Sequence, residues 1–497
     1  MRRGHGRGHG HRWRHATLAA AVASCFSVNP VYANPTGATV VQGQAGISTQ
    51  GNTLTVTNTP GAVINWQGFS IAAGEIARFI QQSQTSSVLN RVVGVNPSAL
   101  LGTLQSNGRV FLVNPNGITI GPGASIDVAG FVASTLNISD GDFIAGRMRF
   151  APTAGAGSVV NQGTINTSSG GVVYLVGNDV QNSGIIRSPQ GEILLAAGKS
   201  VELVDSQTPE IRVQVTAPDN KALNLGQLIS AGGRIGMYGT LVRQSGVVNA
   251  NTAVRGENGK IQFKAFKDVS RDAGSVTTAS GVTAGQIRIE AETGKVSVAG
   301  TVDASASAGR GGRVDIAGKQ GVSVESGGRI AANGLDGGSV TLTSGAGSVQ
   351  IAGKVSADAS SGVGGQVSIN AATQAVVAAG GSVTANGAQT GGNLEIRAPG
   401  TLQEKGRSLE DERRGLITKY LGESATETER GEGLLWGNIQ LTGPVLGNLS
   451  PSMPIVNYGH TAELLTDLRL SSIAVGRSLD NRRDSGRSVH WRGFGDH

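Results

Sequence analysis

Residues 108–120, with the sequence GRVFLVNPNGITI, give the first indication of how this chain folds. Two short runs of β-forming residues, Val110–Val113 and Ile118–Ile120, flank the tetrapeptide Asn114-Pro115-Asn116-Gly117. Proline fixes φ and glycine tolerates positive φ, so the four residues predict a tight corner between two strands. Taken alone, the tetrapeptide is equally compatible with an ordinary hairpin loop.

The sequence around this corner carries further motifs in a fixed order. They are INWQGFSI at residues 64–71, LNRVVGVNPS at residues 89–98 and GPGASIDVAGFVASTLNI at residues 121–138. Together with the corner, they resemble the secretion domain of filamentous haemagglutinins and haemolysin-type exoproteins, the two-partner secretion family. The resemblance covers residues 34–150 almost continuously.

The resemblance implies export through a dedicated outer-membrane transporter, whose soluble periplasmic domains recognise the region from residue 34 to residue 150 or beyond. It also implies that the turn at residues 114–117 keeps the domain competent for export, and that residues 96–97 are a degenerate copy of the same motif. Position 98 departs from the family pattern, because well-studied members carry a second Asn there and this chain has Ser98. The predicted secretion motif comprises Asn96, Pro97, Asn114, Pro115, Asn116 and Gly117.

Residues 1–33 have the features of a signal peptide. Five arginines and no acid precede the mostly apolar run 16–28, and the small-residue pattern at 31–33 predicts cleavage between Ala33 and Asn34. Two alternatives compete with this interpretation. One is a basic, His-rich arm that binds nucleic acid or metal, and the other is lipoprotein processing at Cys25.

The composition favours thin, repetitive β-structure over an ordinary globular enzyme. The chain has 77 glycines, 4% aromatic residues and 15% charged residues, while 38% hydrophobic residues argue against simple disorder. Removing the leader with its five arginines lowers the formal net charge from +7 to +2 and also removes the single cysteine. We therefore expect no nucleic-acid partner. No later segment approaches the roughly 18 apolar residues of a membrane-spanning helix.

A repeat becomes visible in the second half of the chain. Tetrapeptides with Gly at the second position and Ile, Val or Leu at the fourth, each marking the start of an expected strand, begin at residues 232, 258, 284, 311, 337, 364 and 391, which gives offsets of 26, 26, 27, 26, 27 and 27. A fixed period in this range indicates a solenoid. One unit holds three short alternating runs, Arg313–Ile316, Val322–Val324 and Gly328–Ala331, separated by polar or Gly-rich corners.

These runs predict an all-β, right-handed parallel β-helix with an N-terminal cap at Asn34–Trp66. Small aliphatic residues would fill a narrow interior that excludes large aromatic rings, and Asn side chains at corners would bond to Asn in the next coil. Within residues 34–150, only Gly74–Gln82 and Ala99–Leu104 have sequences capable of a helical turn, and one helix is expected in the tail.

Four segments are predicted. They are a signal peptide at 1–33, a two-partner secretion domain at 34–150, β-helix repeats at 151–400, and a charged, partly disordered tail at 401–497. A short β-like piece is expected within the tail, around Leu434–Leu441. The tail is also a candidate for capping or surface retention.

No catalytic, cofactor-binding or metal-binding residue is predicted. A β-helix that acts on polysaccharides would need clustered carboxylates, whereas Asp303, Asp315, Asp336 and Asp358 are scattered one per coil. Beyond residue 33, histidine occurs only at 460, 490 and 497. These observations argue against an enzyme, and the resemblance implies a secreted or surface-associated, adhesin-like exoprotein. Its partners would be the transporter and a host or cell-surface receptor or glycan. The alternatives are a carrier or fragment of a larger exoprotein or toxin, and a β-helical enzyme.

Overall fold

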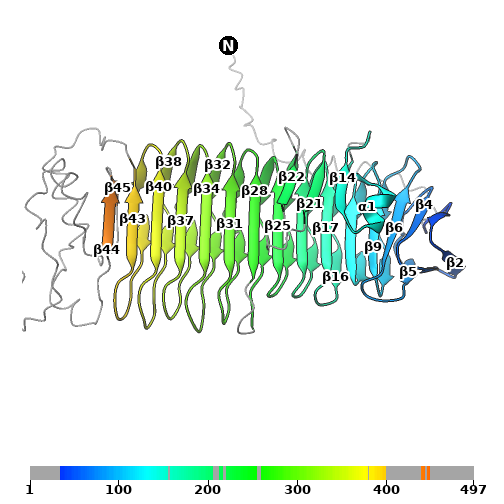
Figure 1. Cartoon of the computed structure of the whole chain (residues 1–497), viewed down its shortest axis with the longest axis horizontal. Coiled ribbons are helices and arrows are strands. Elements are labelled where there is room, and N and C mark those ends of the chain that lie inside the picture. Colours follow the sequence, from blue (N-terminus) through cyan, green and yellow to red (C-terminus); the bar gives the residue numbers. More distant parts are fainter. Residues whose placement is uncertain are drawn as a thin grey trace, which may run out of the picture. The chain divides into compact units, whose positions relative to one another are not determined.

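The structure is a computed structural model that describes residues 34–398, except 155–156, 205–211, 216–219, 254–258 and 379, together with two strands at Asn438–Thr442 and Val445–Gly447. The predicted cleavage site is described only from Asn34 onward, because Ala33 and the rest of the leader lie outside the described residues. Most of the tail lies outside them as well. In the described part, the chain winds into stacked coils, each of which contributes strands to three long sheets (Figure 1).

The three sheets are named here in the order in which a coil visits them. Sheet I contains, in spatial order, β1 (Thr39–Gln42), β4 (Ala62–Trp66), β6 (Ser87–Val92), β9 (Arg109–Val113), β12 (Gly130–Ser134), β17 (Val172–Gly177), β20 (Glu192–Ala197), β25 (Arg234–Gly239), β28 (Lys260–Ala265), β31 (Gln286–Ala291), β34 (Arg313–Gly318), β37 (Ser339–Ser344), β40 (Gln366–Ala371), β43 (Asn393–Arg397) and β44 (Asn438–Thr442).

Sheet II follows sheet I in each coil. It contains β7 (Ser98–Leu100), β10 (Ile118–Ile120), β15 (Ser158–Asn161), β18 (Asp179–Asn182), β23 (Lys221–Asn224), β26 (Leu241–Gln244), β29 (Val269–Arg271), β32 (Lys295–Val298), β35 (Gly321–Val324), β38 (Ser348–Ile351), β41 (Ala375–Val377) and β45 (Val445–Gly447).

Sheet III completes the coil. It contains β2 (Ala45–Gln50), β3 (Thr53–Asn58), β5 (Ile76–Ile80), β8 (Thr103–Ser106), β11 (Ser125–Val128), β16 (Thr164–Thr167), β19 (Ile185–Arg187), β24 (Gln227–Ile229), β27 (Val247–Asn249), β30 (Val276–Thr278), β33 (Thr301–Asp303), β36 (Arg329–Ala331), β39 (Lys354–Ser356) and β42 (Ser382–Thr384).

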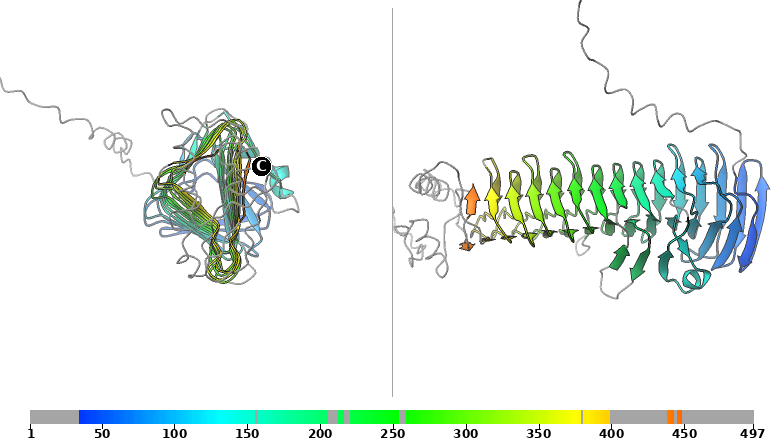
Figure 2. Two further views of the ribbon diagram at one scale, coloured as in Figure 1. Left: turned by 90° about the vertical axis from the view of Figure 1, so that its left-hand side faces the viewer. Right: turned by 90° about the horizontal axis from the view of Figure 1, so that it is seen from above.

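Parallel pairing in constant register confirms the predicted β-helix. Ile287 of β31 pairs with Val314 of β34, which in turn pairs with Val340 of β37, so equivalent side chains stack along the coils. Viewed end-on, the coils superimpose around a common axis (Figure 2). The strands flanking the Asn-Pro-Asn-Gly corner exist as predicted. The hairpin alternative is wrong, because β9 lies in sheet I and β10 lies in sheet II.

The N-terminal cap is shorter than predicted. Strands β1 and β2 pair antiparallel with β4 and β3, and their side chains are mostly exposed. In contrast, β3 and β4 pair parallel with β5 and β6, so residues 53–66 already belong to the first coil. The cap is therefore confined to residues 34–50. At the other end, β44 adds a parallel strand to β43, close to the β-like piece expected in the tail.

The two predicted helical turns are wrong. Gly74–Gln82 contains strand β5, and Ala99–Leu104 spans parts of β7 and β8. Inward-facing Ala77 and Phe79 are buried, so pairing with neighbouring coils prevails over weak local helix propensity. The helix α1 (Asp140–Ile144) is short, and no helix among the described residues has the length and apolar character needed to cross a membrane.

The interior is mostly small and aliphatic, but the exclusion of large aromatic rings is wrong. Trp66, Phe69 and Phe79 are fully buried in the first coils, with ring centroids 5.6 Å apart for Trp66 and Phe69 and 6.4 Å apart for Phe69 and Phe79. Phe131 and Phe263 are also buried inside the stack. These first coils therefore have an aromatic core rather than a purely aliphatic one.

The predicted amide ladder exists on sheet II. The Nδ2 atom of Asn161 donates to Oδ1 of Asn182 (2.7 Å), that of Asn182 donates to Oδ1 of Asn224 (2.8 Å), and that of Asn224 donates to Oε1 of Gln244 (2.7 Å). Each side chain is fully buried, so the chain of hydrogen bonds satisfies polar groups that the core would otherwise leave unpaired. Arg271 occupies the next position in this column.

A small antiparallel sheet covers part of sheet I, which the sequence did not predict. We call it the flap; it consists of β13 (Asn137–Ile138), α1, β14 (Met148–Ala151), β21 (Val201–Val204) and β22 (Arg212–Val215). Both insertions that form the flap leave the coils between sheet I and sheet II, and they lie on one side of the stack (Figure 2).

The flap creates a second apolar core outside the coils. Strands such as β17 and β20 are buried on both faces, whereas β28 and β31 alternate between buried and more exposed residues. The residues of this second core are Val63, Leu89, Phe111, Val113, Val132, Leu136, Ile138, Phe143, Phe150, Tyr174, Val176, Leu194, Ala196, Val201 and Tyr238.

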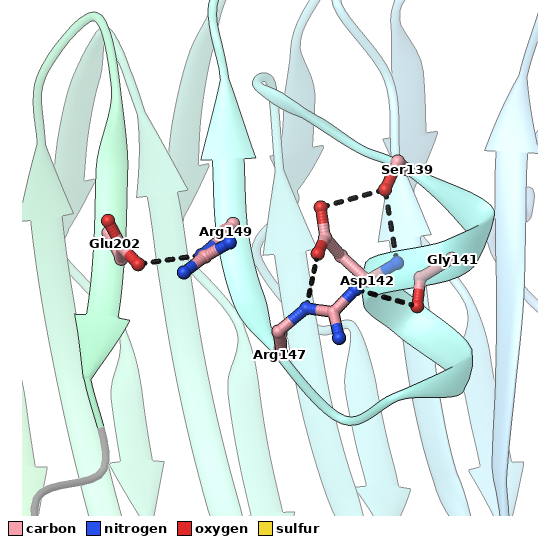
Figure 3. Close-up of polar contacts among 6 residues, drawn as sticks. All are labelled: Ser139, Gly141, Asp142, Arg147, Arg149 and Glu202. Carbon is pink, nitrogen blue, oxygen red and sulfur yellow. Dashed lines mark hydrogen bonds and ion pairs between the residues drawn. The ribbon is translucent and has the colours of Figure 1, made fainter.

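Polar contacts hold the flap in place (Figure 3). The Ser139 hydroxyl accepts from the backbone N–H of Asp142 (3.0 Å) and caps helix α1, while Nε of Arg147 lies 2.7 Å from Oδ1 of Asp142. The guanidinium of Arg149 pairs with Glu202 (2.7 Å) across β14 and β21, and so joins the two insertions.

Candidate secretion motif

The predicted motif residues lie in two stacked corners between sheet I and sheet II. The lower corner, residues 93–97, joins β6 to β7, and the upper corner, residues 114–117, joins β9 to β10. Strands β7 and β10 pair parallel, with Ser98 opposite Ile118. The coil geometry therefore places the Asn-Pro pair at 96–97 directly against the Asn-Pro-Asn-Gly corner.

Asn114 is the buried centre of this arrangement. Its Nδ2 donates to the backbone oxygen of Asn96 (3.0 Å) and to Oγ of Ser98 (2.9 Å), and its Oδ1 accepts from the backbone N–H of Asn116 (3.0 Å). The side chain is fully buried, and both ends of its amide are satisfied. Asn114 therefore closes its own turn and fixes it to the preceding coil.

Asn116 makes a second connection between the coils from an exposed position. Its Nδ2 donates to the backbone oxygen of Gly94 (3.0 Å) and to Oδ1 of Asn114 (3.2 Å). Gly117 has φ +123°, a conformation that favours glycine, and its N–H donates to the backbone oxygen of Asn114 (3.1 Å). The residue types at 114, 116 and 117 thus each meet a specific local requirement.

The coil above closes tightly onto the same corner. The N–H of Gly157 donates to the backbone oxygen of Pro115 (3.2 Å). A Cβ atom at position 157 would lie 2.5 Å from the nitrogen of Gly117 and 2.7 Å from the carbonyl carbon of Asn116. Residue 157 is where the first flap insertion returns to the coils, so the motif corner lies directly beneath the base of the flap.

All six residues of the predicted motif therefore lie together, but they contribute differently. Asn96 contributes its backbone carbonyl, and Pro97 packs near Gly117. Ser98, the position that departs from the family pattern, accepts a hydrogen bond from Asn114. Sequence reasoning missed Gly157, because its contact depends on a coil that starts only after the flap insertion.

Two further residues in the lower coil were missed as structural determinants. Asn90 is fully buried; its Oδ1 accepts from Nε1 of Trp66 (2.9 Å) and its Nδ2 donates to the backbone oxygen of Phe111 (3.2 Å). Arg91 reaches the flap, where Nη2 lies 2.7 Å from Oδ1 of Asp140 and 2.8 Å from the oxygen of Ile138. Both residues lie in the NRVVG motif at 90–94, and the resemblance of this motif to the family was the feature of the sequence that could have identified them.

The outer surface of the two corners is a patch with apolar and amide character. Val95 is 84% exposed and Val93 is 51% exposed, and Asn96, Pro97 and Asn116 are also exposed. The motif residues include no acid, base or nucleophile. Within the described ranges, no group of three or more His, Cys, Asp or Glu side chains is placed to hold a metal ion. The contacts of the corner are thus backbone and amide hydrogen bonds together with apolar packing.

A capped parallel β-helix with an Asn-Pro-Asn-Gly corner between its first sheets defines a class of protein, the secretion domains of exported β-helical exoproteins. Residues 31–278 match the family model described as the TPS secretion domain. The chain belongs to the two-partner secretion exoproteins, which are secreted by a two-partner system to the cell surface or outside the cell.

Similar proteins support this assignment. The structure is similar to the crystal structure of the HMW1 secretion domain from Haemophilus influenzae, with a TM-score of 0.59 and 28% sequence identity. The match covers 75% of this chain and 97% of that one. Two heme/hemopexin-binding proteins of Haemophilus influenzae are 32% identical over 211 residues and 42% identical over 77 residues. These matches cover 40% and 16% of this chain, but only 23% and 8% of the relatives.

Proposed function

We propose that soluble periplasmic domains of an outer-membrane two-partner transporter recognise the two stacked corners, and that the exported chain acts as a non-enzymatic adhesin at the cell surface. The observation that carries the first part is the exposed patch of Val93, Val95, Asn96, Pro97 and Asn116. An exposed apolar patch beside hydrogen-bonding groups is typical of a protein-binding surface.

The exposed edge of the N-terminal cap offers a second contact for the transporter. Strand β1 ends sheet I and β2 ends sheet III, and the side chains of both are mostly exposed. An unpaired strand edge can accept a further strand from a partner. The cap therefore supports recognition by strand addition.

Folding after export needs no external energy source in this scheme. Each coil pairs only with the coils before and after it, so a completed coil presents an edge on which the next coil forms. The chain can therefore fold progressively as it emerges.

Replacing Asn116 with alanine tests recognition through the corner. The change removes two hydrogen bonds from an exposed side chain and leaves the buried amide of Asn114 in place. Expected results are normal folding of purified protein and reduced release into the medium when the transporter is co-expressed.

Asn107→Ala is the matched control. Asn107 is an exposed corner residue of the same coil, and its side chain also makes two hydrogen bonds to the preceding coil, both with the backbone of Gln81 (2.7 and 2.8 Å). Its corner lies between sheet III and sheet I, away from the motif. Equal release of both variants and wild type would contradict recognition through Asn116.

The absence of enzymatic activity is supported by how the four scattered aspartates are used. Asp315 accepts from Nε of Arg313 (2.6 Å), and Asp303 accepts from the N–H of Ser305 (2.9 Å). Asp336 and Asp358 accept from backbone N–H groups of the following coil, at 3.1 and 2.7 Å. Each carboxylate thus has a structural partner.

Haem binding, which the names of two relatives mention, is not part of the function proposed for this chain. Those matches span a small part of each relative. In addition, residues 34–459 contain neither His nor Cys, two of the most common haem-iron ligands.

Adhesion is tested by expressing the chain with its transporter in a non-adherent strain and counting bacteria bound to epithelial cells and to abiotic surfaces. Increased binding is expected. Cleavage of polygalacturonate by purified protein would instead support the enzyme class and contradict a purely adhesive role.

A further inference from the structure

The outer face of sheet I changes character where the flap ends. One outward-facing column runs through Val63, Leu89, Phe111, Val132, Tyr174 and Leu194 in register, and the flap covers it. The column then continues through Gly236, Gln262, Arg288 and Asp315. Its side chains are therefore apolar up to Leu194, absent at Gly236 and polar beyond it.

A groove of about 340 Å³ lies at this transition. It crosses β20, β25, β28, β31 and β34, a span of roughly 19 Å at the usual strand spacing. Leu194, Gly236 and Tyr238 line its end beside the flap. The ring of Tyr238 packs over Gly236, where an added Cβ would lie 2.5 Å from Cε2 of Tyr238, so an aromatic ring borders the groove where the apolar column stops.

Four cations line the groove, against two carboxylates. Arg234 and Lys260 pair in register at the start of β25 and β28, Arg313 occupies the same position in β34, and Arg288 lies in the neighbouring column. With Glu192 and Asp315, the lining carries a net charge of +2, from four positive and two negative groups. The basic groups are therefore repeated along the coil axis.

The cations differ in how far they are already neutralised. Nη2 of Arg234 lies 3.6 Å from Glu192, and Nε of Arg313 lies 2.6 Å from Asp315, which raises the pKa of Arg313. Nη2 of Arg288 lies 3.1 Å from Oε2 of Glu290, a residue outside the groove lining. Of the four cations, Lys260 is the one in no ion pair with a residue that the structure describes. Arg313 is 61% exposed at its side chain, so it can still bind an anion from solution.

We propose that this groove binds an acidic oligosaccharide of uronic-acid type, lying along the coil axis across β25 to β34. Lys260 and the arginines would bind successive carboxylates of the sugar chain, at intervals set by the strand spacing. The amides of Gln262 and Gln286 and the carboxylate of Asp315 would bind its hydroxyl groups.

The mixed lining distinguishes this ligand from other polyanions. Glu192 and Asp315 repel any polyanion, but their carboxylates can accept hydrogen bonds from sugar hydroxyls, which polyphosphate lacks. A neutral oligosaccharide would leave the net positive charge uncompensated.

The inference deepens the proposed adhesive role and rests on it for its biological setting. Its test uses purified full-length chain, so the result does not depend on export. Titration calorimetry with a short oligogalacturonate should show saturable binding that weakens as salt concentration rises. A maltooligosaccharide of equal length serves as the neutral probe, and a short polyphosphate serves as the non-sugar polyanion.

The double variant Lys260→Gln, Arg313→Gln should bind oligogalacturonate at least about tenfold more weakly. The matched control is Arg329→Gln, Lys354→Gln, which removes one arginine and one lysine from adjacent strands of sheet III, far from the groove lining. Circular dichroism checks that both variants fold.

Several outcomes would overturn the proposal. They are no binding by wild type, equal weakening in the control variant, and binding of maltooligosaccharide or polyphosphate as tight as that of oligogalacturonate. The export result for Asn116→Ala does not affect the binding result, because binding is measured on purified protein. A failure to bind oligogalacturonate likewise does not affect the conclusion about export.

Discussion

The indole Nε1 of Trp66 donates a 2.9 Å hydrogen bond to Oδ1 of Asn90, and both side chains are buried between the first coils. Asn90 also donates to the backbone oxygen of Phe111 in the next coil. One amide therefore connects three successive strands of sheet I, at the point where the stack begins.

Replacing Asn90 with alanine should destabilise the first coils by about 2–4 kcal/mol, because a buried donor and a buried acceptor lose their partner and a small cavity forms. Hydrogen exchange of the amides in β4, β6 and β9 measures the loss. Asn370→Ala, at a half-buried side chain far along the stack, should leave these amides unchanged. Equal protection in wild type and Asn90→Ala would contradict the role assigned to this residue.

Arg271 should be a net cost to stability. Its Nε and Nη1 have no hydrogen-bond partner among the residues that the structure describes, although Nη2 donates to the oxygen of Thr301 (2.9 Å) and the guanidinium lies 5.7 Å from the ring centre of Phe263. Arg271→Met should stabilise the protein by about 1–4 kcal/mol, because it removes a buried charge that lacks a counter-ion. Arg271→Lys, which keeps the charge, should give no gain in urea unfolding.

The same residue predicts a pH dependence. Burial lowers the pKa of Arg271 from the usual arginine value to about 9. Between these values the unfolded chain holds a proton that the folded chain has released, so this group makes the protein more stable as pH rises above about 9. The stability difference between wild type and Arg271→Met should therefore shrink above that pH. A difference that stays constant would show that the buried guanidinium does not titrate in this way.

Helix α1 should open in acid. Hydrogen bonds from Arg147 and Ser139 lower the pKa of Asp142 below its usual 3.8. The stabilisation is complete above that value and disappears as pH falls through the lower pKa of the folded state. Exchange of the Phe143 and Ala145 amides, compared between about pH 5 and pH 2, should show loss of protection in wild type. Asp142→Asn should lack this pH response. Arg147→Gln should show a smaller response than wild type, because it removes one of the two hydrogen-bond donors to Asp142.

Gly157→Ala should disturb the secretion motif from above. The added Cβ would lie within 2.7 Å of the Asn116 and Gly117 backbone, so the corner must shift, at a cost of about 1–3 kcal/mol. The midpoint temperature of thermal unfolding and the amount of protein released into the medium should both decrease. Gly141→Ala, in the same insertion, has nothing within 4 Å of its added Cβ and should behave like wild type. Normal release of Gly157→Ala would show that the corner tolerates displacement.

The coils were predictable because each one repeats the same environment at a constant sequence separation. The runs at Arg313, Val322 and Gly328 correspond to β34, β35 and β36, and the Asn ladder follows from stacked corners. Position 114 was also predictable, because the Asn-Pro-Asn-Gly turn closes through local hydrogen bonds. Its partners in the preceding coil were not, because Gly94 and Asn96 become neighbours only through the coil register.

The flap could not be predicted from the strands that it covers. Val172–Gly177 and Glu192–Ala197 are apolar on both faces, which indicates double burial but not what supplies the second layer. That layer comes from short segments in two separate insertions, one around α1 and one that begins near Val201. The groove lining combines five strands of sheet I with the edge of this layer at Leu194 and Tyr238, so the sequence did not reveal the groove either.

The flap also sets an order of events during synthesis and export. Its first strands come from residues 137–151 and its last from residues 201–215, and they join only when Arg149 meets Glu202. A nascent chain that has emerged no further than residue 200 has the cover that residues 137–151 supply, including Phe143 against Phe111, but it lacks β21 and β22, so part of the apolar column on sheet I is still exposed. Stop codons placed shortly before residue 200 should yield truncated products that aggregate, whereas stop codons placed after residue 215 should yield truncated products that stay soluble.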